Sequence, residues 1–199
     1  MSRLGDWRTW RVKRRWYERN HSLRRRLRAD AHAARGGFFI RHPFEGEVLE
    51  GLDSGRLEIG RDTLLEPGCW LTLGPEARIR IGSGCFLNRG TMIAALELVE
   101  IGDHTMFANG CFIGDADHRY DDATKPITQQ GFVPRGPVRI GANCWFGVNS
   151  VITGGVEIGD RAVIGANSVV TQSIPGGVIA AGAPAKVIRE IEFAEGSGG

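Results

Sequence analysis

The chain has 199 residues, of which 42% are hydrophobic and 29 are glycine, and this is the size of one ordinary domain. No apolar run approaches the roughly 18 residues of a membrane-spanning helix, and the basic N-terminus lacks the apolar core of a secretory signal. The net charge is +2, but residues 1–28 carry eleven Lys or Arg against two acids, a local charge of +9. The sequence therefore predicts a cytoplasmic protein with a separate basic segment and no nucleic-acid partner.

Residues 1–30 are predicted to form a basic amphipathic helix, because they contain no proline and their apolar side chains fall roughly on one face: Val12, Trp16, Leu23 and Leu27. One interpretation is that residues 1–28 lie on an anionic membrane surface, which would place the protein peripherally at the inner membrane face. The other is that this helix caps the repeat that follows or packs on a neighbouring subunit. Residues 31–56 are predicted to be a transition segment, broken by Gly36-Gly37 and Pro43.

From about residue 57, apolar residues recur every six positions in groups of three. A six-residue period is the signature of a parallel β-helix, in which each unit adds one short strand, one turn and one inward side chain. The chain is expected to make about five coils, within a β-helix domain over 57–183. The inward positions are Ile59, Leu65, Leu71, Ile81, Leu87, Ile93, Ile101, Phe107, Ile113, Ile140, Phe146, Ile152, Ile158, Ile164 and Val170.

All four cysteines occupy a second, smaller inward position of the six-residue unit: Cys69, Cys85, Cys111 and Cys144. Stacked coils are ~4.8 Å apart, so cysteines on one face two coils apart lie about 10 Å from each other, too far for a disulfide. They are interpreted as core residues in a reducing compartment, and none is expected to act as a nucleophile.

The third and fourth coils are separated by an excursion over about 115–137, which opens with DADHRYDD. An imidazole among four carboxylates can be held as a proton acceptor, so His118 is a candidate general base. A calcium loop fails at three ligand positions, and a solvated acidic loop with an incidental histidine remains the alternative. After the coils, Pro175-Gly176-Gly177 ends the period, Val178 to Ala181 can add a last strand, and residues 184–199 form a closing segment with a disordered tail.

The six-residue region, the excursion and the run NCWFGVNSVITGGVEIGDRAVIGANSVVTQSIPGGVIAAGAPAKVIRE resemble the hexapeptide-repeat O-acetyltransferases, over residues 57–191. These include the galactoside, maltose and xenobiotic acetyltransferases. The resemblance implies an all-β fold, a left-handed parallel β-helix, assembled as a homotrimer with active sites between subunits. It also implies acetyl-CoA or another acyl-CoA as co-substrate, with no metal.

The resemblance implies roles for individual residues. His118 matches the catalytic base, and Val148 supplies a backbone N–H as oxyanion donor. The acceptor side is assigned to Asn88, Asp117, Tyr120 and Asp121, and the coenzyme A side to Trp145, Ala166, Thr171, Lys186 and Arg189.

The predicted function is an acyl-CoA-dependent O-acyltransferase that modifies a hydroxyl of a sugar or glycan-type acceptor. A xenobiotic or antibiotic O-acetyltransferase is the alternative within the same chemistry. A non-catalytic β-helical binding or scaffold protein is the alternative from another class, and it predicts no affinity for coenzyme A. A metal-dependent hydratase on the same fold would need three interfacial histidines, and the coils offer two, His104 and His118.

Overall fold

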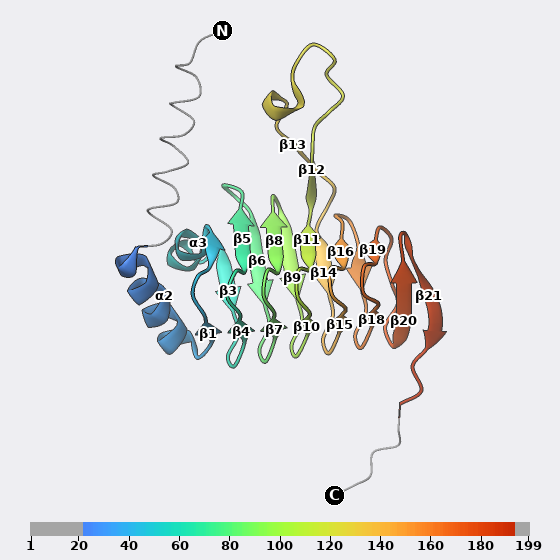
Figure 1. Ribbon diagram of the computed structural model, residues 1–199, viewed down its shortest axis with the longest axis horizontal. Helices are drawn as coiled ribbons and strands as arrows, with labels where there is room; N and C mark the ends of the chain where they lie inside the picture. Colours follow the sequence, from blue (N-terminus) through green and yellow to red (C-terminus); the bar gives the residue numbers. More distant parts are fainter. Residues whose placement is uncertain (1–21, 194–199) are drawn as a thin grey trace, which may run out of the picture.

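The computed structural model describes residues 22–193, which wind into a parallel β-helix with helices at one end and an antiparallel strand pair at the other (Figure 1). The helices are α2 (Leu23–Gly36) and α3 (Val48–Ser54). A hairpin, β12 (Ala116–His118) with β13 (Phe132–Pro134), rises from the side of the rod and carries the short 3-10 helix η1 (Ile127–Gln129). No helix within the described residues is long and apolar enough to cross a membrane.

Three sheets form the faces of the rod, and each coil contributes one strand to each sheet. The eight-stranded sheet contains β1 (Phe39–Ile40), β4 (Leu64–Leu65), β7 (Phe86–Leu87), β10 (Met106–Phe107), β15 (Trp145–Phe146), β18 (Val163–Ile164), β20 (Val178–Gly182) and β21 (Ala185–Glu190). The six-stranded sheet contains β2 (Glu45–Gly46), β5 (Trp70–Leu73), β8 (Met92–Ala95), β11 (Phe112–Gly114), β16 (Val151–Ile152) and β19 (Val169–Val170). The five-stranded sheet contains β3 (Leu57–Ile59), β6 (Arg78–Ile81), β9 (Leu98–Ile101), β14 (Val138–Ile140) and β17 (Glu157–Ile158).

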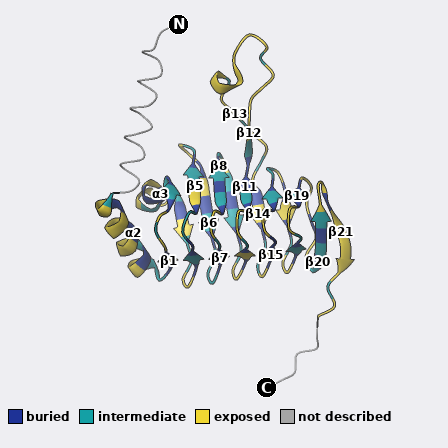
Figure 2. Ribbon diagram, in the orientation of Figure 1, coloured by how far each residue is buried: buried dark blue, intermediate teal, exposed yellow. Residues whose placement is uncertain are grey.

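The core is a set of inward side chains stacked in register from coil to coil. Buried positions recur along the strands of the rod (Figure 2). In the eight-stranded sheet one such row runs through Leu87, Phe107 and Phe146, all fully buried. The rings of Phe107 and Phe146 stack with their centroids 4.6 Å apart. This register confirms the six-residue period, because a slip by one residue would turn the whole row toward solvent.

The β-helix has about six turns, one more than the sequence predicted, because the segment 31–56 contributes strands β1 and β2. These strands pair in parallel with β4 and β5. The inward residue of β2 is Gly46, where a Cβ atom would lie 2.0 Å from the Leu71 carbonyl oxygen. Since this position cannot hold an aliphatic side chain, the extra turn is invisible to a search for the six-residue period.

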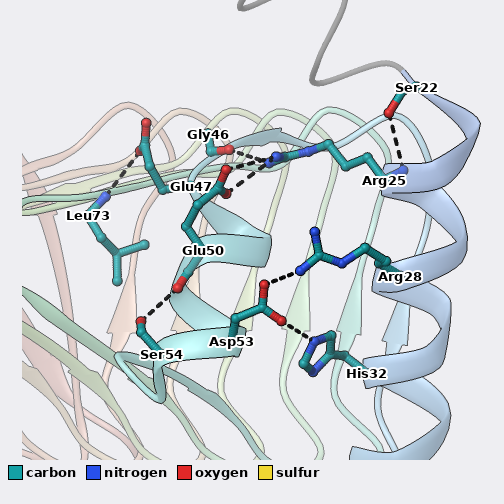
Figure 3. A network of polar contacts seen from close by, with 10 residues as sticks. All are labelled: Ser22, Arg25, Arg28, His32, Gly46, Glu47, Glu50, Asp53, Ser54 and Leu73. Carbon is teal, nitrogen blue, oxygen red and sulfur yellow. Dashed lines mark hydrogen bonds and ion pairs between the residues drawn. The ribbon is translucent and has the colours of Figure 1, made fainter.

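Helix α2 covers the N-terminal end of the rod. Leu23 and Leu27, predicted on one apolar face, are 69% and 60% exposed, and the buried face carries Arg25, Ala29 and Ala33. The two alanines permit close packing, and the guanidinium of Arg25 finds partners in the body of the protein (Figure 3). The remainder of the predicted helix, residues 1–21, lies outside the described residues.

At the other end, Pro175 and two glycines end the repeat, and β20 adds a last parallel strand to the eight-stranded sheet. Strand β21 then folds back antiparallel to β20. The predicted disordered tail, residues 194–199, lies outside the described residues.

Candidate active site

The hairpin β12–β13 leaves the rod at the second corner, the name used here for the turns that lead from the six-stranded to the five-stranded sheet. Its two strands pair antiparallel, with His118 opposite Phe132. Figure 1 shows the hairpin rising away from the coils. The expected excursion over about 115–137 therefore has an ordered base and an extended end.

The base of the hairpin is held by the Asp115 carboxylate, which is fully buried. Its oxygens accept hydrogen bonds from the backbone N–H groups of Leu96, Glu97 and Leu98, at 2.6, 2.7 and 2.8 Å. The backbone carbonyl oxygen of Asp115 accepts a further hydrogen bond from the backbone N–H of Arg135, at 2.8 Å. A buried charge needs such partners, and here they fasten both strands of the hairpin to the preceding coil.

The following coil leaves room for the hairpin base by carrying glycine at two positions. A Cβ atom on Gly154 would lie 2.6 Å from the Cβ of Arg135, and one on Gly155 would lie 2.5 Å from the Arg135 carbonyl oxygen. Gly155 also has φ +76°, a conformation that favours glycine. The base of the hairpin is thus packed between the preceding and the following coil.

His118 lies exposed on β12, with its imidazole against the ring of Phe132. The ring centroids are 4.4 Å apart and the planes are tilted by 37°. Because strand side chains alternate, Asp117 points to the other side of the hairpin. There its carboxylate pairs with Arg135 at 2.7 Å and raises the pKa of that guanidinium.

The acidic residues around His118 are committed to other partners. Asp121 pairs with Arg119 at 3.3 Å, and Asp122 pairs with Lys125 at 2.8 Å, which lowers the pKa of Asp122. Among the residues that the structure describes, none of the four carboxylates forms a hydrogen bond or ion pair with His118. The expected ring of acids around the imidazole is replaced by an aromatic neighbour, because strand pairing decides which side chains meet.

A second group of predicted residues lines the first corner, where the turns lead from the eight-stranded to the six-stranded sheet. Asn88, Val148 and Ala166 occupy turns of successive or near-successive coils, and Lys186 pairs in register with Ala181 near the end of β20. The Asn88 side chain accepts a hydrogen bond from the next backbone N–H, at 2.8 Å. The structure thus brings these four into one row along the rod.

Trp145 and Val148 lie beside each other at this corner and are 48% and 44% exposed. Within the described residues, the backbone N–H of Val148 donates no hydrogen bond, and neither does that of Ala166. Unpaired N–H groups at an exposed corner are available donors for a carbonyl or oxyanion.

Three assigned residues lie away from this row or at its end. Thr171 is exposed beyond β19, toward the second corner, and Arg189 is exposed on β21 opposite Ile179. Tyr120 is 67% exposed on the hairpin. The six-stranded sheet lies between the base of the hairpin and the first corner.

A groove of about 1070 Å³ lies elsewhere, along the turns that lead from the five-stranded to the eight-stranded sheet. It contains none of the assigned residues. An alternating row of charged side chains on the five-stranded sheet lines it, comprising Glu58, Arg80, Glu100, Arg139 and Glu157. Ion pairs join Arg80 to Glu58 and Glu100, and Arg139 to Glu100.

The cysteines take no part in the site. All four are free and buried, as expected. Burial raises the pKa of each thiol, that of Cys69 to about 12, so the thiolate that a nucleophile requires is disfavoured.

Sequence reasoning missed the aromatic neighbour of His118 and misjudged the role of Asp115. Phe132 lies fourteen positions downstream, and only the antiparallel pairing of β12 with β13 brings it to the imidazole. Asp115 was expected beside the imidazole but acts in the base of the hairpin. Strand β13 has only three residues, and so short a segment gives too weak a pattern to predict a strand from the sequence.

The chain is similar to several known proteins. Residues 137–172 match the family model for the hexapeptide repeat of succinyl-transferase. Galactoside O-acetyltransferase of Escherichia coli is 36% identical over 151 residues, covering 75% of this chain and 72% of that enzyme. A probable acetyltransferase of Mycobacterium tuberculosis is 36% identical over 132 residues, covering 63% of this chain, which spans only 44% of that protein's length. The hexapeptide-repeat acetyltransferase of Vibrio cholerae, solved with acetyl coenzyme A, is 25% identical with a TM-score of 0.55, covering 91% of this chain and 85% of that one.

The chain belongs to the hexapeptide-repeat acetyltransferase family. The predictions of a parallel β-helix and of this family are confirmed, and so is the class of enzyme, an acetyltransferase that uses acetyl-CoA.

Proposed function

We propose that the chain transfers an acyl group, acetyl in the first instance, from coenzyme A to a hydroxyl of a sugar or glycan-type acceptor, with His118 as general base. The observation that carries this proposal is the exposed imidazole on an anchored hairpin. Asp115 and the glycines of the next coil fix the base of that hairpin, so the position of the ring is defined before substrate binds.

The chemistry follows from the groups at hand. His118 accepts the proton of the acceptor hydroxyl while its oxygen attacks the thioester carbonyl carbon. A C–O bond forms, negative charge develops on the carbonyl oxygen, and the Val148 N–H stabilises that charge. The C–S bond then breaks, and the imidazolium returns its proton to the departing thiolate.

The other assigned residues bind the two substrates. Trp145 would lie along the thioester, and the free N–H of Ala166 with the hydroxyl of Thr171 would bind the pantetheine chain. The exposed charges of Lys186 and Arg189 at the end of the row suit the phosphates of coenzyme A. On the acceptor side, Asn88, Asp117, Tyr120 and Asp121 offer the hydrogen-bonding groups that a polyhydroxylated ligand needs.

The test is turnover of acetyl-CoA with a panel of hydroxylated acceptors, sugars first and antibiotics second. His118→Ala should lower kcat by at least ~100-fold, the low end for general-base catalysis, without lowering the melting temperature. Ile127→Ala, an exposed apolar change in the same hairpin, is the matched control. Near-normal turnover by His118→Ala contradicts the assignment, and failure to bind coenzyme A at all favours the scaffold alternative.

We also propose that the active form is a homotrimer in which the hairpin of one chain meets the first corner of another. Two of the three outward faces support this, because each carries an apolar row in register from coil to coil. In the eight-stranded sheet the row is Phe39, Leu64, Phe86, Met106, Trp145, Val163 and Ile179, and in the six-stranded sheet it is Trp70, Met92, Phe112, Val151 and Val169. The third face carries the alternating charges. Extended apolar rows on two faces mark surfaces that other chains cover.

Sedimentation should then report about three times 21.7 kDa. A complementation test asks whether two chains build one site. Co-expression of His118→Ala with Trp145→Ala should restore part of the activity that each variant lacks, because some sites in a mixed trimer receive both native residues. A fully active monomer, or mixed trimers without restored activity, would contradict this proposal.

The proposed location is the cytoplasm, with peripheral association at the inner membrane face through the basic residues 1–28. The charge of +9 in that segment supports it.

A further inference from the structure

We infer that the outward face of α2 is a docking surface for an anionic lipid bilayer, with Leu23 and Leu27 as the side chains that enter the lipid interface. This deepens the peripheral location proposed above and rests on it. The sequence placed these leucines on one face of a helix and left open whether that face meets a membrane or caps the rod, and in the structure the face is exposed.

The orientation of α2 is fixed by polar contacts to the body of the protein (Figure 3). Arg25 donates to the Gly46 carbonyl oxygen at 2.5 Å and pairs with Glu50 at 3.3 Å, and its guanidinium lies 5.4 Å from the centre of the Phe44 ring. Asp53 on α3 accepts from both Arg28 and His32. Because breaking a buried charge pair is costly, the helix cannot roll over to bury its leucines.

The outward face is an apolar stripe bordered by arginines. Leu23 and Leu27 are one helical turn apart, 69% and 60% exposed, and the exposed Ala31 continues the stripe one turn further. Arg24 and Arg26 flank it, and within the described residues neither has an acidic partner. An exposed apolar stripe with basic borders is the pattern of a helix that lies in a membrane interface.

The charge of the surroundings selects an anionic partner. α2 carries one acidic residue, Asp30, and its carboxylate is engaged with His42 at 2.9 Å. The eleven basic residues of the first 28 belong to this helix and to the segment that leads directly into it. On α2 itself, Arg25 and Arg28 are paired with Glu50 and Asp53, whereas the bordering Arg24 and Arg26 have no acidic partner among the described residues and remain available to an anionic surface.

The position of α2 in the molecule is compatible with docking. Its buried face packs on the end of the rod, and its outward face points away from all three sheets (Figure 1). The hairpin with His118 rises from the side of the rod, near its middle. A membrane at the end of the rod would leave that hairpin and the first corner open to substrates.

The experiment is vesicle flotation of the full chain, using phosphatidylcholine vesicles with and without phosphatidylglycerol. Leu23→Ser with Leu27→Ser is the test variant. Val187→Ser with Ile188→Ser is the matched control, since these side chains are also exposed, at 47% and 64%, but on β21 at the other end of the rod. We expect the native chain and the control to float with the anionic vesicles only, and salt to release them. The leucine variant should lose at least about tenfold in partitioning.

Acetyl transfer to a soluble acceptor is measured on the same samples and should be equal for the native chain and the leucine variant. Equal flotation of both overturns the docking surface, because the segment before α2 would then suffice. Absence of flotation by the native chain also overturns it. If the leucine variant instead loses thermal stability or changes oligomeric state, the stripe is covered by protein, either residues 1–21 or a second copy, and the inference is wrong. Loss of transfer in every sample would count against the proposed enzyme and leave the flotation result to decide the docking surface.

Discussion

The coils and the hairpin follow opposite rules of construction. In the coils, each inward side chain stacks on its equivalents in the neighbouring coils and is buried, so packing defines every position. In the hairpin, His118, Tyr120 and Phe132 are exposed, and pair contacts arrange the side chains. The difference teaches that the buried rows of the coils hold the stability, whereas the candidate functional groups lie on exposed positions of the hairpin and the coil corners, and that hairpin and coils meet at Asp115. Changes to the buried side chains of the coils should alter folding, and changes in the hairpin should alter turnover.

The strongest test of the separation is a cavity in the coils. Phe107→Ala removes a fully buried ring stacked on Phe146 and should destabilise the protein by about 3–5 kcal/mol in urea unfolding. The transferase activity per folded molecule should remain close to native. A loss of activity without a loss of stability would show that the buried side chains of the coils take part in the chemistry more directly than their packing indicates.

A substitution at Asp115, where the hairpin joins the coils, should lower both stability and turnover. Asp115→Asn replaces one acceptor oxygen with an NH2 group facing backbone donors, which leaves at least one buried N–H unpaired and costs about 1–3 kcal/mol. Because the same residue fixes the hairpin base, kcat should fall as well. Thermal unfolding and steady-state kinetics on one preparation measure the two effects. Loss of stability with kcat intact would mean that the hairpin finds its position without this anchor.

Phe132→Ala should affect turnover with little change in stability. Aromatic pairs contribute about 0.5–1.5 kcal/mol beyond their buried area, so loss of the ring beside His118 should reduce kcat by roughly 2–10-fold. Ile127→Ala, which removes an exposed side chain of the same hairpin, should leave kcat at the native value. A native kcat for Phe132→Ala would reduce the aromatic contact to incidental packing.

The smallest effect is expected where α2 meets α3. The hydrogen bond from His32, reinforced by Arg28, holds the pKa of Asp53 below its ordinary value. A carboxyl with a lowered folded-state pKa contributes stability above its unfolded pKa, and this contribution is lost as the pH falls below about 4. Asp53→Asn should therefore cost at most about 1 kcal/mol near neutral pH, since the group is 42% exposed. It should also reduce the fall in melting temperature at acid pH. A fall identical to that of the native protein would exclude Asp53 as its source.

Much of the site could be placed from the sequence because it lies on the repeat. Once the six-residue period is known, the corner that holds Asn88, Val148 and Ala166 follows, since equivalent turns stack at one edge of the rod. The position of Lys186 followed only in part, because it depends on the reversal of β21 against β20. The partners of His118 could not be predicted, because they are set by the antiparallel pairing of residues fourteen positions apart.

The sequence by itself determined the β-helix, the inward rows and the buried, unreactive cysteines, since a strict period repeats the same local decision in every coil. Only the tertiary structure decided what happens where the period stops. The extra turn at β1 and β2 hides behind Gly46, which carries no side chain to signal it. The orientation of α2 depends on the partners that Arg25 finds 21 and 25 residues away, and a burial of arginine in preference to leucine cannot be read from helical periodicity. Contacts between distant segments made these choices, and no local pattern encodes them.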